Sequence, residues 1–187
     1  EEIEEMVMEE EAAPSRLTGL YGEIDDDNSK ELAGALLSYL HEARKSDEES
    51  PPVDMVISTG GGQVADMFAI YDLMRMLREE CEIITLGIGK VMSAGILLLA
   101  AGTKGKRQIG KHCRIMFHHI IASDGGSLPN IASAYKEAHR MEKMMFEAVA
   151  TESNLTIKEL RRICSKNVDV YFTAEEAVKM GIADIVV

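Results

Sequence analysis

The sequence has no long apolar run and no excess of positive charge, and these absences remove two classes of protein. Its longest apolar stretch, residues 91–101, reaches about half of the roughly 20 residues that a membrane-spanning helix needs, and Ser93 and Gly95 interrupt it. We therefore expect no membrane partner. The net charge is −12, with no cluster of Lys and Arg that could neutralise phosphates, so we expect no nucleic-acid partner.

Cysteine is also scarce. Cys81, Cys113 and Cys164 are an odd number at wide spacing without a CxxC pair, so neither a disulfide framework nor a zinc site is predicted. Residues 1–14 are rich in glutamate and lack the basic start and apolar centre of a secretory signal. We interpret them as a flexible acidic arm. We expect the protein in the cytoplasm or another reducing intracellular compartment, such as an organelle matrix or stroma, with free thiols.

The remaining residues, 15–187, are enough for a single globular domain, and 46% of the chain is hydrophobic. Strand-like runs alternate with helical patterns at short intervals, which is typical of crossover units on a largely parallel sheet. The fold class predicted is therefore α/β. The strand-like runs are 16–24, 53–58, 81–89, 113–119 and 182–187, and the helical patterns between the second, third and fourth of them are 63–77 and 94–102.

Local signals predict where further helices begin. Asn28 followed by Glu31 predicts a capping box for the first helix, and the stretches "TIKE" (156–159) and "TAEE" (173–176) predict capping boxes for two short helices. A long helix is predicted over 130–152. Because methionine is frequent on its apolar stripe, we interpret that stripe as an adaptable packing or self-association surface.

A few polar residues and glycines near strand ends are candidates for chemistry. Taken singly, each has an ordinary structural interpretation: Ser93 as a helix cap, the glycines 60–62 as a tight turn, and Asp169 as a turn or cap residue. His118 and His119 end a strand, where a histidine is commonly structural. None of these residues alone identifies a function.

Taken together, the same residues predict a site. In an alternating α/β domain, the ends of strands that lead into helices open on one rim, where ligands bind. A serine nucleophile needs a base to remove its proton and a third group to orient that base, and glycines let backbone amides approach an oxyanion. The chain lacks the glycine patterns of nucleotide-binding loops and any carboxylate pair or metal-ligand cluster. These features favour acyl transfer.

The motifs around these residues resemble one known family. The stretches are "ISTGGGQVADMFAIYDLM", "GIGKVMSAGILLLAAGTKGKRQI", "CRIMFHH" and "VDVYFTAEEAVKMGIADIV". In order and spacing they resemble the ClpP family, the proteolytic subunits of the ATP-dependent Clp protease in the ClpP/crotonase superfamily. The likeness covers nearly everything from Ser15 to the end. It implies a spiral of β-α units with a protruding handle, here at about 122–155.

Position by position, the resemblance implies a catalytic triad. Ser93 would be the nucleophile, His118 the general base and later acid, and Asp169 the carboxylate that orients the histidine. His118 rather than His119 matches the family's strand-end histidine, since it directly follows "IMF". Here "HHI" stands where the family usually reads His-Gln-Pro.

The resemblance also implies an oxyanion hole and a substrate-binding segment. The oxyanion donors would be the backbone N–H groups of Gly62 and Ala94. Gly60, Gly61 and Gln63 would belong to the segment that holds the substrate. Gly60 replaces the proline that family members usually carry.

The function implied is a serine endopeptidase that cuts unfolded proteins inside a chamber of heptameric rings stacked as a tetradecamer. This subunit would need no cofactor, and ATP would be used by a partner AAA+ unfoldase. Asp54 and Val56 stand where aromatic residues commonly help to dock that unfoldase. Two alternatives stay open: a non-catalytic or specialised ring subunit, such as an assembly factor or a dedicated maturation protease, and a crotonase-type acyl-CoA enzyme.

Overall fold

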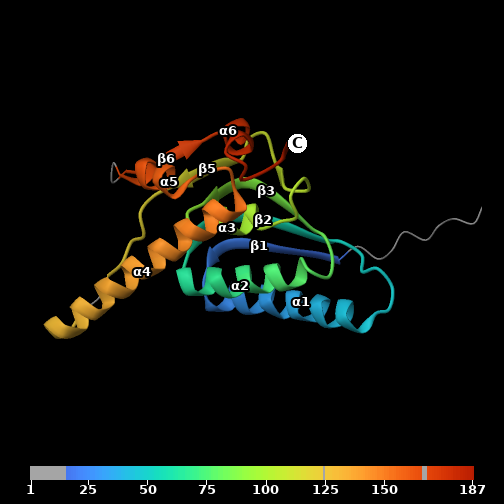
Figure 1. Ribbon diagram of the computed structural model, residues 1–187, viewed down its shortest axis with the longest axis horizontal. Helices are drawn as coiled ribbons and strands as arrows, with labels where there is room; N and C mark the ends of the chain where they lie inside the picture. Colours follow the sequence, from blue (N-terminus) through green and yellow to red (C-terminus); the bar gives the residue numbers. More distant parts are fainter. Residues whose placement is uncertain (1–15, 124, 166–167) are drawn as a thin grey trace, which may run out of the picture.

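The computed structural model describes residues 16–123, 125–165 and 168–187 (Figure 1). The predicted acidic arm at 1–14 lies outside the described residues, so it stays a prediction. The elements run in the order β1 (Arg16–Ile24), α1 (Asp26–Lys45), β2 (Val53–Gly62), α2 (Val64–Leu77), β3 (Ile83–Met92), α3 (Gly95–Ala100), β4 (Gln108–Ile109), β5 (Arg114–Phe117), α4 (Leu128–Glu152), α5 (Ile157–Cys164), β6 (Val170–Phe172), α6 (Ala174–Lys179) and β7 (Ile185–Val186).

The strands form one sheet that is parallel except at a single pair. Its main path is β1-β2-β3-β4-β7, and every pairing along this path is parallel. The long strand β3 pairs with β4 at Leu86 and Gly87, then with β5 from Lys90 to Met92. Only β6 runs antiparallel to its neighbour β5. The predicted α/β class with crossover units on a largely parallel sheet is confirmed.

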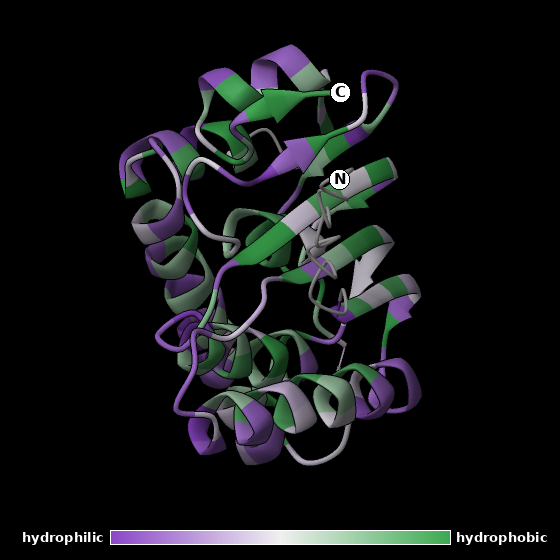
Figure 2. Cartoon of the chain, turned by 90° about the vertical axis from the view of Figure 1, so that its right-hand side faces the viewer, coloured by the Kyte–Doolittle hydropathy of each residue, from purple (hydrophilic) through white to green (hydrophobic). Residues whose placement is uncertain are grey.

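Helices cover the sheet and bury an apolar core. Helices α1 and α2 lie side by side along one face, while α3 packs on β2 and β3 with all of its residues buried (Figure 1). Hydrophobic residues concentrate in the strands, whereas the outer helices alternate hydrophobic with hydrophilic residues (Figure 2). Among the described residues, no helix combines the length and hydropathy that crossing a bilayer requires.

Helix α4 projects away from the sheet (Figure 1). Its buried residues, Met145, Phe146, Val149 and Glu152, all lie in its last two turns, whereas Ile131 and Tyr135 nearer its start are exposed. The methionine-rich stripe therefore packs into the core only at the C-terminal end of α4, and the N-terminal part of the helix lies at the surface.

The helix starts confirm two of the three predicted capping boxes. Thr156 with Glu159, and Thr173 with Glu176, each make both reciprocal hydrogen bonds of the box. The prediction for α1 is wrong: Asp25 caps this helix by accepting from the Asn28 N–H at 2.9 Å. Asparagine and aspartate are equally good caps, so the sequence "DDDN" did not decide between them.

A buried ion pair anchors the C-terminal end of α4 to α2. Glu152, 2% exposed, accepts hydrogen bonds from both terminal nitrogens of Arg78 and from the Tyr71 hydroxyl, each at 2.9 Å. Burial alone would raise the pKa of Glu152, but hydrogen bonding to Arg78 and the charge of Arg78 hold it below its ordinary value. Burial and the Glu152 carboxylate raise the pKa of Tyr71 to about 12.

Breaking this pair is expected to destabilise the fold. Arg78→Met leaves a buried carboxylate without its cation and should cost about 3 kcal/mol, or roughly 10 °C in Tm. The control is Arg44→Met, which removes an exposed partner of Glu80 and should cost less than about 1 kcal/mol. Thermal unfolding of both variants at pH 7 measures the difference. Equal losses of Tm in the two variants would contradict the stabilising role of the Arg78–Glu152 pair.

The pH dependence of this loss has a defined sign. The lowered pKa of Glu152 means that the pair contributes stability above about pH 4.5, the ordinary value, and loses it as the pH falls further toward the folded-state pKa. Without Arg78, burial raises the pKa of Glu152, so the stability gap between wild type and Arg78→Met should begin to narrow above pH 4.5 and narrow further below it. Denaturant titrations at pH 7 and pH 4 test this, and an unchanged gap would contradict it.

Candidate active site

The three predicted triad residues each occupy the first position beyond a strand. Ser93 follows β3, His118 follows β5, and Asp169 precedes β6. These strands are neighbours in space, because β5 pairs with β3 on one side and with β6 on the other. Three residues far apart in the chain are thereby brought to one rim of the sheet.

The strand registers place the triad residues more closely. In the antiparallel β5–β6 pair, Phe117 lies opposite Val170, and these are the strand residues next to His118 and Asp169 in the sequence. On the other side, the Ser93 N–H donates to the Met116 carbonyl of β5 at 2.8 Å. The chain turn bearing Ser93 is thus fixed to the strand that leads to His118.

Ser93 lies in a sharp turn between β3 and the buried helix α3. Its φ of +52° is the only positive φ of a non-glycine residue in the described ranges, and such strain of about 1–2 kcal/mol is commonly stored at functional sites. The N-cap of α3 is Ala94, and no side chain makes a capping hydrogen bond there. Ser93 is therefore not the helix cap.

The glycine run is a strand and not a tight turn, which corrects the structural interpretation of "TGGG". Strand β2 continues through Gly62, and a bulge at Gly60 shifts its register against β1, where Gly22 pairs with Thr59 and Glu23 with Gly61. The buried Thr59 hydroxyl accepts from the Gly61 N–H at 3.0 Å. Because a parallel neighbour pairs with β2, the run stays extended although glycines favour turns.

Glycine is required at 61 and 62 by close approach. A Cβ on Gly61, whose φ is +98°, would lie 2.7 Å from the Ser93 Cβ and 3.2 Å from the Ser93 Oγ. A Cβ on Gly62 would collide with the Ile24 backbone of β1. Gly60 differs, since its Cβ would meet only the Lys90 Nζ at 3.9 Å. The backbone of β2 at Gly61 therefore lies in direct contact with the Ser93 side chain.

A cavity of about 410 Å³ opens where these elements meet. Two of the three predicted triad residues, Ser93 and His118, line it. His119 instead turns toward α4 and hydrogen-bonds Glu142, so only His118 of the two histidines shares the cavity with Ser93. The other lining residues are Gly22, Glu23, Gly60, Gly61, Gly62, Val64, Lys90, Ile120, Ile121 and Met145.

Some predicted residues lie off the cavity lining. Asp169 is exposed and accepts a long hydrogen bond of 3.5 Å from the Tyr171 hydroxyl. Gln63 is exposed, and its backbone N–H donates to the Ile24 carbonyl at 2.7 Å. No hydrogen bond joins Ser93 Oγ to His118, both of which are described. The triad and the role of Gln63 therefore stay predictions.

Of the two predicted oxyanion donors, Ala94 directly follows Ser93 in the sequence, and Gly62 lines the same cavity as Ser93. Ala94 is buried, and its N–H makes no hydrogen bond to the part of the chain that the structure describes. At the end of β2, Gln63 rather than Gly62 donates to the Ile24 carbonyl. The Ala94 amide is thus not committed to another bond in the described ranges, as a donor to a developing oxyanion must be.

Several lining residues were missed by the sequence reasoning. Gly22 and Glu23 could have been found, because β1 is also a parallel strand that ends at this rim. Lys90 lies three residues before Ser93 and reaches toward the bulge at Gly60. Met145 carries no such signal, since it reaches the cavity from a helix distant in sequence.

A parallel α/β sheet with serine, histidine and aspartate beside the ends of three adjacent strands defines a candidate serine hydrolase. Comparison with known proteins gives the family. The sequence model of the family described as Clp protease matches residues 5–187, and the chain belongs to this family of serine endopeptidases.

Curated relatives agree with the family model. The chain is 31% identical over 172 residues to the ATP-dependent Clp protease proteolytic subunit 2 of Rhodococcus jostii, covering 92% of this chain and 84% of that protein. It is 34% identical to proteolytic subunit 4 of the same organism, with the same coverage. Subunit 1 of Corynebacterium jeikeium is 31% identical, with 92% and 87% covered.

Proposed function

We propose that this chain hydrolyses peptide bonds of unfolded proteins through an acyl-enzyme formed on Ser93. The observation that carries the proposal is the placement of Ser93, His118 and Asp169 beside the ends of the adjacent strands β3, β5 and β6. A scaffold protein has no need for these three groups at one rim, whereas acyl transfer requires a nucleophile, a base and an orienting carboxylate together.

The proposed steps use this chain's residues and water. The Ser93 Oγ attacks the scissile carbonyl while His118 takes its proton, and the oxyanion receives hydrogen bonds from the N–H groups of Ala94 and Gly62. His118 then returns the proton to the leaving amine. Water then attacks the ester while His118 takes the proton of the water, and His118 returns this proton to the Ser93 oxygen as that oxygen leaves. Asp169 holds the imidazole orientation throughout.

The active assembly we propose is a chamber of heptameric rings stacked as a tetradecamer. The projecting first part of α4, with Leu128 at 82% exposure and Tyr135 at 72%, supports contact with further copies of this chain. The names of the relatives include ATP dependence. We propose that ATP is used by a partner AAA+ unfoldase and that this subunit needs no cofactor. The free thiols Cys81, Cys113 and Cys164 support a reducing compartment such as the cytoplasm.

The test is cleavage of an unfolded protein by the purified chain, alone and with an AAA+ unfoldase and ATP, with the native mass measured in parallel. We expect cleavage into short peptides by a particle of fourteen subunits, faster with the unfoldase. Rings that form but cleave nothing would overturn the proposal in favour of a non-catalytic ring subunit. Saturable binding of coenzyme A without proteolysis would favour a crotonase-type enzyme.

A further inference from the structure

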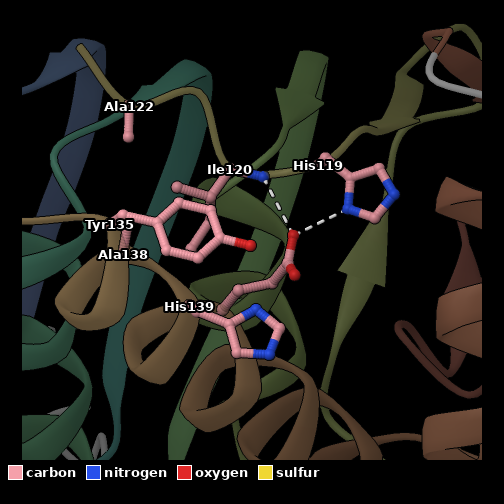
Figure 3. Close-up of a pocket in the computed structure, with 7 residues that line it drawn as sticks. His119, Ile120, Ala122, Tyr135, Ala138 and His139 are labelled. Carbon is pink, nitrogen blue, oxygen red and sulfur yellow. Dashed lines mark hydrogen bonds and ion pairs between the residues drawn. The ribbon is translucent and has the colours of Figure 1, made fainter. Parts of the chain in front are cut away.

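A single carboxylate on α4, that of Glu142, holds the chain segment that follows His118, the proposed general base. Glu142 Oε1 accepts a hydrogen bond from His119 Nδ1 at 2.7 Å and from the Ile120 N–H at 3.4 Å (Figure 3). His119 and Ile120 are the two residues directly after His118. The Glu142 side chain is 18% exposed, so this contact is partly shielded from water.

The contact matters because this segment has little else to fix it. Strand β5 ends at Phe117, and residues 118–123 belong to no helix or strand. The two bonds to Glu142 are their only hydrogen bonds to the part of the chain that the structure describes. The position of the His118 backbone beyond β5 therefore depends on α4.

The same segment forms the wall between two cavities. Ile120 lines the catalytic cavity beside Ser93, and it also lines a second cavity of about 380 Å³ against α4. In Figure 3 dashed lines from the Ile120 N–H and the His119 ring mark the two bonds to Glu142, and Tyr135 and His139 of α4 lie beside them. A displacement of the segment 118–123 would therefore move both the His118 side chain and the cavity wall at Ile120.

We propose that Glu142, acting through His119 and Ile120, is a positioning residue that aligns His118 with Ser93. This inference rests on the proposed function. Charged and titratable groups surround the contact. His139 and Tyr135 line the second cavity, and Lys143 and Arg161 line a further hollow together with Glu142. Burial, and to a lesser extent the Glu142 charge, raise the pKa of the Cys164 thiol. Because Glu142 can accept from either a neutral or a protonated His119, the alignment does not require a change of charge.

The test uses substitutions that remove or retain the hydrogen bonds in the full-length assembled protein. His119→Leu and Glu142→Leu remove the side-chain contact, and we expect kcat on a short peptide to fall about 10- to 100-fold with KM changed less than about threefold. His119→Gln keeps a donor and Glu142→Gln keeps an acceptor, so both should recover most of the lost kcat. Glu142→Leu already removes both bonds, so the variant that combines His119→Leu with Glu142→Leu should lose no more than Glu142→Leu alone.

The control is Glu137→Ala on the same helix, which removes an exposed partner of Arg140 and should leave kcat unchanged. Tm and native mass are measured for every variant. Unchanged kcat in both leucine variants would overturn the proposal. A loss of kcat that parallels a loss of Tm or of native mass would also overturn it, and so would a loss of kcat that the glutamine variants do not restore. A wild-type protein that cleaves nothing would instead refute the proposed function.

Discussion

Ser93→Ala and Ser93→Gly are expected to abolish peptide hydrolysis equally while differing in stability. Both remove the nucleophilic oxygen, which in a serine protease lowers kcat on the order of 10⁶-fold, to the background rate. The turn has a φ of +52°, which glycine adopts without penalty and alanine does not. The glycine variant should therefore be more stable than the alanine variant by about 1 kcal/mol, or roughly 3 °C in Tm.

The control for this ranking lies on α1. Gly34 is an exposed helical residue, and a Cβ there would meet nothing within 4 Å. Gly34→Ala should stabilise the protein by roughly 0.5–1 kcal/mol, the order opposite to that at Ser93. Initial rates with a fluorogenic peptide and thermal melts measure both effects. Activity above background in Ser93→Ala would refute the role of Ser93, and a more stable alanine variant would refute the strained turn.

Gly61→Ala is expected to produce the second largest loss. The new methyl group would lie 2.7 Å from the Ser93 Cβ and 3.0 Å from the Met92 carbonyl, on a backbone with a φ of +98°. Left-handed strain and overpacking together should cost about 2–4 kcal/mol of stability. Displacing Ser93 by about 1 Å should lower kcat about 100-fold.

The neighbouring glycine provides the comparison. A Cβ at Gly60 meets only the flexible end of Lys90 at 3.9 Å, so Gly60→Ala should cost much less in stability and activity than Gly61→Ala. Melting curves and kcat for the pair, measured side by side, test the contact between the glycine strand and Ser93. Equal losses of Tm and kcat in Gly60→Ala and Gly61→Ala would show that Gly61 is not in close contact with Ser93.

Much of the fold could be predicted because local patterns and tertiary structure agree. The alternation of strands and helices gave the parallel sheet, and the boxes at Thr156 and Thr173 mark helix starts in both sequence and structure. The glycine run failed as a turn because its pairing with β1 is a long-range interaction. Propensity describes a residue's own preferences, and a neighbouring strand can override them.

The candidate site could be predicted only as far as strand ends allow. Ser93 and the pair His118 and His119 were candidates because they lie where strands end, and the family resemblance selected His118; the cavity includes Ser93 and His118. The contact of Glu142 with the segment after His118 joins residues 23 apart, and nothing in the local pattern of α4 marks one glutamate among several. Such contacts depend on how the long helix crosses the loop, which periodicity does not specify.

The most direct test of the account is to identify which residue a fluorophosphonate probe modifies. The probe reacts with an activated serine, so the account predicts one adduct per chain, located by tandem mass spectrometry on the peptide that contains Ser93. Labelling should vanish in Ser93→Ala and slow strongly in His118→Ala. An adduct on another residue, or undiminished labelling of Ser93→Ala, would contradict the assignment of Ser93 as the nucleophile.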